Sequence, residues 1–329
     1  MASLVTYAQI RKSRDREIRH VSSSAASLNL FHDQIIRQTV AAALDRIKEE
    51  SGPPPSPFSF FVMGSAGRRE QGIWSDQDHG IIYEGGPAQT KHYFLKLGNE
   101  ISEGLLQTGY KKCEGNVMAS NPMWCRSLQE WEKQLKEWVL DASWESIRYL
   151  LTFLDGRTLH GESSFITRLK LRAYETIHQG KLLVRILQNT MHVRKGVGVL
   201  GQFLVETHGP YTGMLNIKDT ALFPYVNGAR LLAIHEKILE TSTIQRLEEL
   251  PDSLLPRRER DKLRDSFINL QNYRLLFSNH SDYESGHYLA VDRLTKQQRK
   301  VLKEGLKDGI HLYEYVRKLV EKEDRDGRE

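Results

Sequence analysis

Two aspartates one residue apart, Asp76 and Asp78, are the residues of this sequence whose type and spacing most directly suggest chemistry. They are followed by an apolar run, Ile81-Ile82-Tyr83, which is typical of a β-strand. Side chains two positions apart on a strand point to the same face, so we expect the two carboxylates to project together. Neighbouring carboxylates repel unless a cation lies between them, and Mg²⁺ or Mn²⁺ prefers such oxygen ligands. The pattern therefore predicts a divalent-metal site held by Asp76 and Asp78.

A turn upstream of the aspartates has the composition of a phosphate-binding turn. An apolar, strand-like run stops at Gly64 and Ser65. Gly64 allows close approach of the backbone, and Ser65 offers a hydroxyl and can cap a helix that starts near Ala66, whose first N–H groups would point at an anion. Arg68 and Arg69 add forked donors. We therefore expect nucleotide phosphates at Gly64, Ser65, Arg68 and Arg69, with a structural ion pair as the open alternative for Arg68.

These residues carry a family resemblance. Met63-Gly64-Ser65, a gap of ten residues and then Asp76-Gln77-Asp78 resemble the signature of the nucleotidyltransferase superfamily that includes DNA polymerase beta and the PII-protein uridylyltransferases. The fuller string, GSAGRREQ…SDQDHGIIY, is similar to the nucleotidyltransferase family DUF294. Two later stretches, residues 115–131 and 217–233, also resemble that family.

The resemblance implies an activity and a set of partners. The expected reaction is Mg²⁺-dependent transfer of a nucleoside monophosphate from a nucleoside triphosphate to an acceptor hydroxyl, with Asp76 and Asp78 as the catalytic and metal-binding residues. By resemblance to the PII uridylyltransferases, the acceptor is expected to be a protein side chain rather than a nucleic acid. Asn227 and Arg230, three residues apart in the second family-like stretch, are further candidates for nucleotide contacts.

One departure from the superfamily pattern opens an alternative function. The superfamily often places a third carboxylate on a strand near residues 117–120, and this sequence has no acid there. Glu114 and Asp155 are the two substitutes that the sequence offers. A chain with two metal-binding aspartates alone could bind a nucleotide without turning it over. A catalytically inactive sensor or scaffold is therefore the alternative to an enzyme.

Charge, motif context and apolar runs argue against several other classes, among them an RNA-directed nucleotidyltransferase, which stays open as a further alternative. The net charge of +5 is small for 329 residues and argues against an RNA-directed enzyme. Gly196-x-Gly198-x-x-Gly201 matches a dinucleotide fingerprint, but it follows a helical pattern and is expected to be a loop. Cys113 and Cys125 are expected to be free thiols, with no zinc site or disulfide framework. The absence of a long apolar run predicts a cytoplasmic protein without membrane contact.

The elements that position these residues predict an α+β fold with a small mixed-sheet nucleotidyltransferase domain followed by a helical bundle. Residues 1–52 are expected to hold one amphipathic helix, ended by the prolines of residues 53–57. Residues 53–165 are predicted to form the nucleotidyltransferase domain, with a short strand at 117–118 and all strands ending before about residue 125. Residues 166–329 are predicted to be helical, and Thr295 to Gln298 predict a capping box for the last helix.

Overall fold

The computed structural model describes residues 5–191 and 193–326. The chain divides into two compact units, one made of Met1–Asp141 with Tyr149–Ala173 and the other of Ala142–Arg148 with Tyr174–Glu329. The first unit holds a four-stranded mixed sheet with helices, and the second is mainly helical, so the predicted α+β class is confirmed. The N-terminal helices belong by their contacts to the same unit as the sheet.

The sheet of the first unit has the strand order β3-β2-β1-β4. Its strands are β1 (Phe58–Val62), β2 (His79–Tyr83), β3 (Cys125–Ser127) and β4 (Arg157–Gly161). Strand β1 pairs antiparallel with both β2 and β4, whereas β2 and β3 are parallel. Every residue of β1 and β2 is buried, which explains why both read as continuous apolar runs rather than as alternating patterns.

Helices of the first unit cover both faces of this sheet. On one face, Phe58 and Tyr83 contact Phe94 of α4 (Ala88–Thr108), and α4 packs against α1 (Tyr7–Val21) and α2 (Ala25–Ser51). On the other face, Phe61 contacts Trp131 of α5 (Leu128–Asp141), whose indole N–H donates to the carbonyl of Ile81. The two central strands are therefore enclosed, and the ends of the strands are left to carry the polar residues.

Three predictions about elements were wrong. Strands do not end before residue 125, because β4 forms the sheet edge beside β1 and β5 (Leu215–Asn216) pairs with β6 (Tyr288–Leu289). Residues 117–118 are not a strand. The single N-terminal helix is two helices, since the side chain of Ser24 accepts the N–H of Ser27 and starts α2. Strand β4 has one fully buried position, Leu159, so its pairing depends on distant partners and leaves little local pattern.

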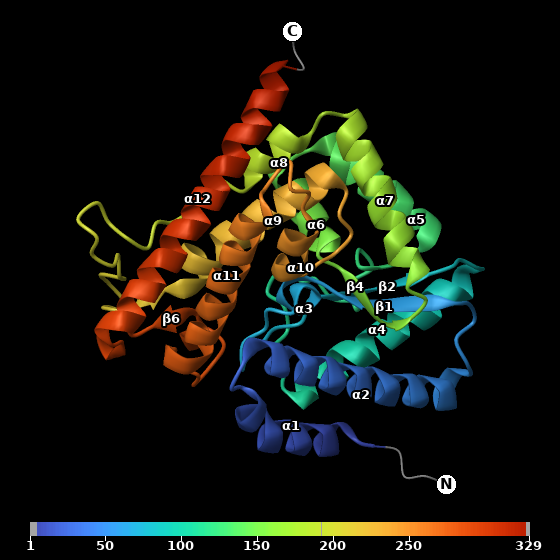
Figure 1. The fold of residues 1–329 in the computed structure, drawn as a ribbon. Helices are drawn as coiled ribbons and strands as arrows, with labels where there is room; N and C mark the ends of the chain where they lie inside the picture. The colour runs from blue at the N-terminus through green and yellow to red at the C-terminus, as the bar shows by residue number, and fades with distance from the viewer. Residues whose placement is uncertain (1–4, 192, 327–329) are drawn as a thin grey trace. The chain divides into compact units, whose positions relative to one another are not determined.

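The second unit is a bundle around a buried central helix. Helix α9 (Phe223–Glu236) contacts its neighbours α8 (Leu183–Asn189), α10 (Thr243–Glu249) and α12 (Lys296–Asp326), and α12 also contacts α11 (Arg257–Phe277). The chain enters α9 through a π-helical turn, Lys218–Leu222, and short 3₁₀ turns lie at Ser285–His287 and Val291–Arg293. Helices α6 (Trp144–Leu154) and α7 (Ser164–Gln179) contain two of the three unit boundaries (Figure 1).

Two local predictions for the second unit are confirmed. The N–H of Thr295 donates to Oε1 of Gln298 at 2.8 Å, and the N–H of Gln298 donates to Oγ1 of Thr295 at 3.2 Å, which is the capping box at the start of α12. Residues 196–201 form a loop, not the strand-to-helix turn of a dinucleotide site. Within the described part of the chain, no helix combines the length and apolar content needed to cross a membrane.

Candidate functional site

The structure brings Asp76 and Asp78 together directly before β2. One carboxylate oxygen of each aspartate and Sγ of Cys113 all lie within 4.8 Å of one another. The backbone fixes this segment from both sides, since the carbonyl of Asp78 accepts the N–H of Met63 at 2.7 Å and the N–H of Gln77 donates to the carbonyl of Lys111 at 3.0 Å. The two carboxylates are thus held in place by main-chain pairing at the carboxyl end of β1.

The third member of the group, Cys113, is placed by the same pairing. Asp76 and Lys111 form a parallel bridge, in which the N–H of Lys111 donates to the carbonyl of Ser75 at 3.1 Å. Two residues further along each segment, Asp78 and Cys113 come opposite each other. The thiol hydrogen-bonds to the carboxylate of Asp78. Burial and the charges of Asp78 and Asp76 raise the pKa of the Cys113 thiol to about 12.

The Gly64 turn lies against the second aspartate. The backbone of Gly64 has φ +54°, and a Cβ at this position would fall 2.4 Å from Oδ2 of Asp78. Helix α3 (Gly64–Arg68) starts here, and its first hydrogen bond runs from the N–H of Gly67 to the carbonyl of Met63 at 2.8 Å. The prediction that Ser65 caps this helix was wrong, because glycine lets the chain turn directly after Met63 and the helix begins one residue before Ser65.

The guanidinium of Arg68 is held by two carboxylates. Its Nε donates to Oε2 of Glu70 at 2.7 Å and its Nη1 to Oδ2 of Asp155 at 2.5 Å. Burial opposes the charge of Arg68, but the two carboxylates outweigh it and raise the pKa of the guanidinium above its ordinary value. This geometry favours the structural ion pair that the sequence had left open for Arg68.

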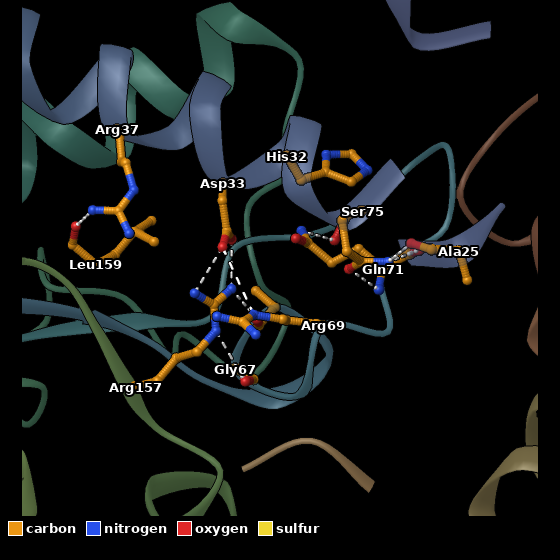
Figure 2. Close-up of polar contacts among 12 residues, drawn as sticks. Ala25, His32, Asp33, Arg37, Gly67, Arg69, Gln71, Ser75, Arg157 and Leu159 are labelled. Atoms are coloured by element: carbon orange, nitrogen blue, oxygen red, sulfur yellow. Dashed lines mark hydrogen bonds and ion pairs between the residues drawn. The ribbon is translucent and has the colours of Figure 1, made fainter. Parts of the chain in front are cut away.

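Arg69 turns toward helix α2 instead. Its backbone is left-handed, with φ 57°, its side chain is 47% exposed, and its Nε lies 4.0 Å from Oδ2 of Asp33. Asp33 also pairs with Arg157 of β4, whose Nη1 donates to Oδ2 at 2.9 Å. Figure 2 shows the carboxylate of Asp33 facing both guanidinium groups, which lie side by side in the view. Arg69 is therefore the less restrained of the two arginines that follow the turn.

Arg157 fastens the end of α3 to the rest of the unit. Its Nη2 donates to the carbonyl of Ala66 at 2.8 Å and its Nε to the carbonyl of Gly67 at 3.1 Å (Figure 2). The carbonyl of Ala66 also accepts the N–H of Arg69 at 3.3 Å, so Arg157 adds to the hydrogen bonds that close this short helix. Strand β4, which the sequence pattern did not reveal, thus supplies a main support of the Gly64 turn.

Neither of the acids suggested as a third carboxylate joins the group. Glu114 is exposed and pairs with Lys111 at 2.7 Å, and Asp155 is fully buried beside Arg68. Among the described residues, the cluster of three candidate ligand atoms contains two carboxylates and one thiol. The two carboxylates suit a divalent cation such as Mg²⁺ or Mn²⁺, whereas the thiol is a softer donor. Cys113 lies in the segment where the superfamily often places its third carboxylate. Its position is therefore the signal in the sequence, but its thiol is not the acid that the superfamily pattern calls for.

Comparison with protein families covers most of the chain. Residues 9–145 match the family model described as "Putative nucleotidyltransferase DUF294", and residues 180–320 match the one described as "Putative nucleotidyltransferase substrate binding domain". The chain belongs to the DUF294 family. The first match contains Gly64, Asp76, Asp78 and Cys113, so the clustered residues lie inside the segment described as a nucleotidyltransferase. No curated protein matches the chain.

In this DUF294 chain, the residues of the second family-like stretch are arranged as the helical pattern predicted. Arg230 is buried on α9, and its Nη1 donates to Oδ1 of Asn227 at 3.0 Å. Lys218 lies in the π-helical turn, with Nζ 5.6 Å from the ring centre of Tyr283. π-Helical turns often occur at functional sites, so this entry to α9 is a second candidate region.

The second unit also contains a pocket of about 230 Å³, lined in part by residues of the DUF294 substrate-binding segment. Its polar lining includes His178, Lys181, His235 and Glu323. His235 hydrogen-bonds to Glu323 at 2.9 Å through Nε2 and to Glu236 at 2.6 Å through Nδ1. Burial opposes the imidazolium of His235, but these two carboxylates raise its pKa. The pocket therefore carries both signs of charge beside apolar walls.

Proposed function

We propose that this chain is a divalent-metal-dependent nucleotidyltransferase that transfers a nucleoside monophosphate from a nucleoside triphosphate to an acceptor hydroxyl. The observation that carries the proposal is the contact of the Gly64 turn with Asp78 inside a cluster that also holds Asp76. This places hard anionic ligands beside a turn whose backbone N–H groups can face a phosphate. The family match supports the same reaction class.

Each residue of the site has a proposed role. Asp76 and Asp78 bind a cation, Mg²⁺ in the first instance, which when bound neutralises charge on the phosphates. The backbone at Gly64 and the hydroxyl of Ser65 orient the triphosphate, and Arg69, which is half exposed, can extend to it. Arg68 keeps the turn in place through Glu70 and Asp155. The acceptor oxygen attacks the α-phosphorus, pyrophosphate leaves, and the hydroxyl proton passes to a base.

We further propose that the acceptor is a protein side chain, as in the PII uridylyltransferases that the sequence resembles. In this proposal residues 53–165 perform the transfer and residues 166–329 recognise the acceptor. The support for this division is that residues 180–320 match the model described as a substrate-binding domain.

A second candidate, nucleotide binding without turnover, is favoured by one observation. The third atom of the cluster is a thiol, and both alternative acids, Glu114 and Asp155, are engaged by basic side chains. A sensor or scaffold would need the nucleotide contacts but no group that accepts the proton of a hydroxyl. The two functions differ in a single measurable property, which is turnover.

The test is titration calorimetry of ATP, UTP, GTP and CTP with Mg²⁺ or Mn²⁺ present. We expect metal-dependent binding of at least one nucleotide to the wild type and its loss in Asp76→Asn/Asp78→Asn. The control, Glu49→Gln/Glu50→Gln, removes two carboxylates from the exposed end of α2 and should bind normally. Pyrophosphate release with a protein extract as acceptor separates the enzyme from the sensor. No binding of any nucleotide to folded wild type would refute both.

A further inference from the structure

Cys113 occupies a position that the fold defines closely. The bridge between Asp76 and Lys111 sets its register, and the N–H of Asn116 donates to its carbonyl at 3.0 Å in a turn where Asn116 has φ 52°. Beyond that turn, the carbonyl of Val117 accepts the N–H of His79 at 3.1 Å, so both ends of the turn are tied to the segment that carries the aspartates. These backbone hydrogen bonds therefore place the sulfur of Cys113 beside the two carboxylates.

The chemistry of the three donors is mixed. Carboxylate oxygens suit Mg²⁺, Ca²⁺ and Mn²⁺, whereas a thiolate selects softer cations such as Zn²⁺. Zn²⁺ accepts sulfur and carboxylate oxygen together, and its catalytic sites have three protein ligands with a fourth position open. Two carboxylates and one thiolate meet that number. Mg²⁺ would engage the two carboxylates alone.

We propose that Cys113 is a metal ligand and that it increases the preference of the Asp76–Asp78 site for Zn²⁺ over Mg²⁺. The proposal deepens the proposed function, because it concerns the cation of the same site. On binding, the S–H bond breaks, a sulfur–metal bond forms and the proton passes to solvent. Cys113 therefore strengthens the retention of Zn²⁺ when both cations are offered.

Co²⁺ is the spectroscopic probe for this ligand, because sulfur bound to Co²⁺ gives a near-ultraviolet charge-transfer band that carboxylates do not give. We expect the band to grow to one equivalent in the wild-type protein without nucleotide. It should be absent in Cys113→Ser, with Co²⁺ affinity at least about tenfold weaker. Cys125→Ala is the matched control, since Cys125 is buried in β3 and should leave the band unchanged. A folded wild type that binds Co²⁺ without the band overturns the proposal.

A second variant is expected to weaken the preference for Zn²⁺. Cys113→Asp gives the site three oxygen donors, so Zn²⁺ competition against bound Mn²⁺ should weaken by at least about tenfold. An unchanged competition constant would contradict a sulfur ligand. The proposed function and the proposed ligand can fail separately. If the sulfur-to-cobalt band appears but no nucleotide binds with any metal, the proposed nucleotidyltransferase function is refuted and Cys113 is still supported as a metal ligand. If nucleotide binds in the presence of Mg²⁺ but the band is absent, Cys113 is refuted as a metal ligand and the proposed function is still supported.

Discussion

The backbone of Gly64 and the carboxylate of Asp78 lie so close that a Cβ at position 64 would fall 2.4 Å from Oδ2. The Gly64 turn, which is proposed to bind phosphate, is therefore in contact with Asp78, which is proposed to bind the metal. This proximity would place a cation held by Asp78 beside phosphates held at the turn, which the proposed transfer requires.

Gly64→Ala is expected to abolish metal-dependent nucleotide binding while leaving the protein folded. The added methyl group meets Asp78 and must displace its carboxylate, and the φ of +54° costs an alanine about 1–2 kcal/mol. Calorimetric titration with nucleotide and metal, together with thermal unfolding, measures both effects.

Gly52→Ala is the control for backbone strain. Gly52 also has a positive φ, +81°, but a Cβ there would meet nothing within 4 Å. This variant should lose stability and keep its nucleotide affinity. If both variants bind nucleotide equally well, the contact between Gly64 and Asp78 has no role in binding.

Arg68→Met is expected to destabilise the first unit by about 3–5 kcal/mol, because it leaves the buried carboxylates of Glu70 and Asp155 without their cation. Unfolding in denaturant measures this change. Arg168→Met is the matched control, since Arg168 pairs with Glu132 at 2.8 Å with 57% of its side chain exposed, and should cost about 1 kcal/mol or less. Equal losses in the two variants would argue against the buried pair as a support of the turn.

The residues that sequence reasoning found are those whose signal is local. Gly64, Asp76 and Asp78 lie within fifteen positions of one another, and the two aspartates come together as predicted, although both precede β2 and do not lie on the strand. The capping box of Thr295 and Gln298 could also be predicted from the sequence, because its two residues are only three positions apart.

The residues that were missed are those brought in from elsewhere in the chain. Arg157 reaches Asp33 from 124 positions away, and its strand has too few buried positions to show a pattern. Cys113 depends on a parallel bridge between two loop segments, which no periodicity encodes. The spacing of Arg68 fits both a phosphate contact and an ion pair, and the positions of Glu70 and Asp155 around its guanidinium favour the ion pair.

Acidification is expected to destabilise the first unit through His32. The ring is fully buried, with Nε2 2.9 Å from the carbonyl of Gly72 and Nδ1 2.9 Å from the hydroxyl of Tyr110. The carbonyl can only accept, so Nε2 carries the proton of the neutral ring and Nδ1 accepts from Tyr110. Burial, followed by the charge of Arg14, lowers the pKa of His32 from 6.5 to about 3.

The sign follows from which state binds the proton. Below pH 6.5 the unfolded chain protonates His32 and the folded protein does not until about pH 3, so stability falls as the pH drops through this window. One such group contributes a slope of up to about 1.4 kcal/mol per pH unit. Denaturant unfolding at a series of pH values should therefore give a shallower slope for His32→Gln than for the wild type. His20→Gln, at an exposed histidine of α1, should retain the wild-type slope. Identical slopes in all three proteins would mean that His32 takes up a proton without unfolding.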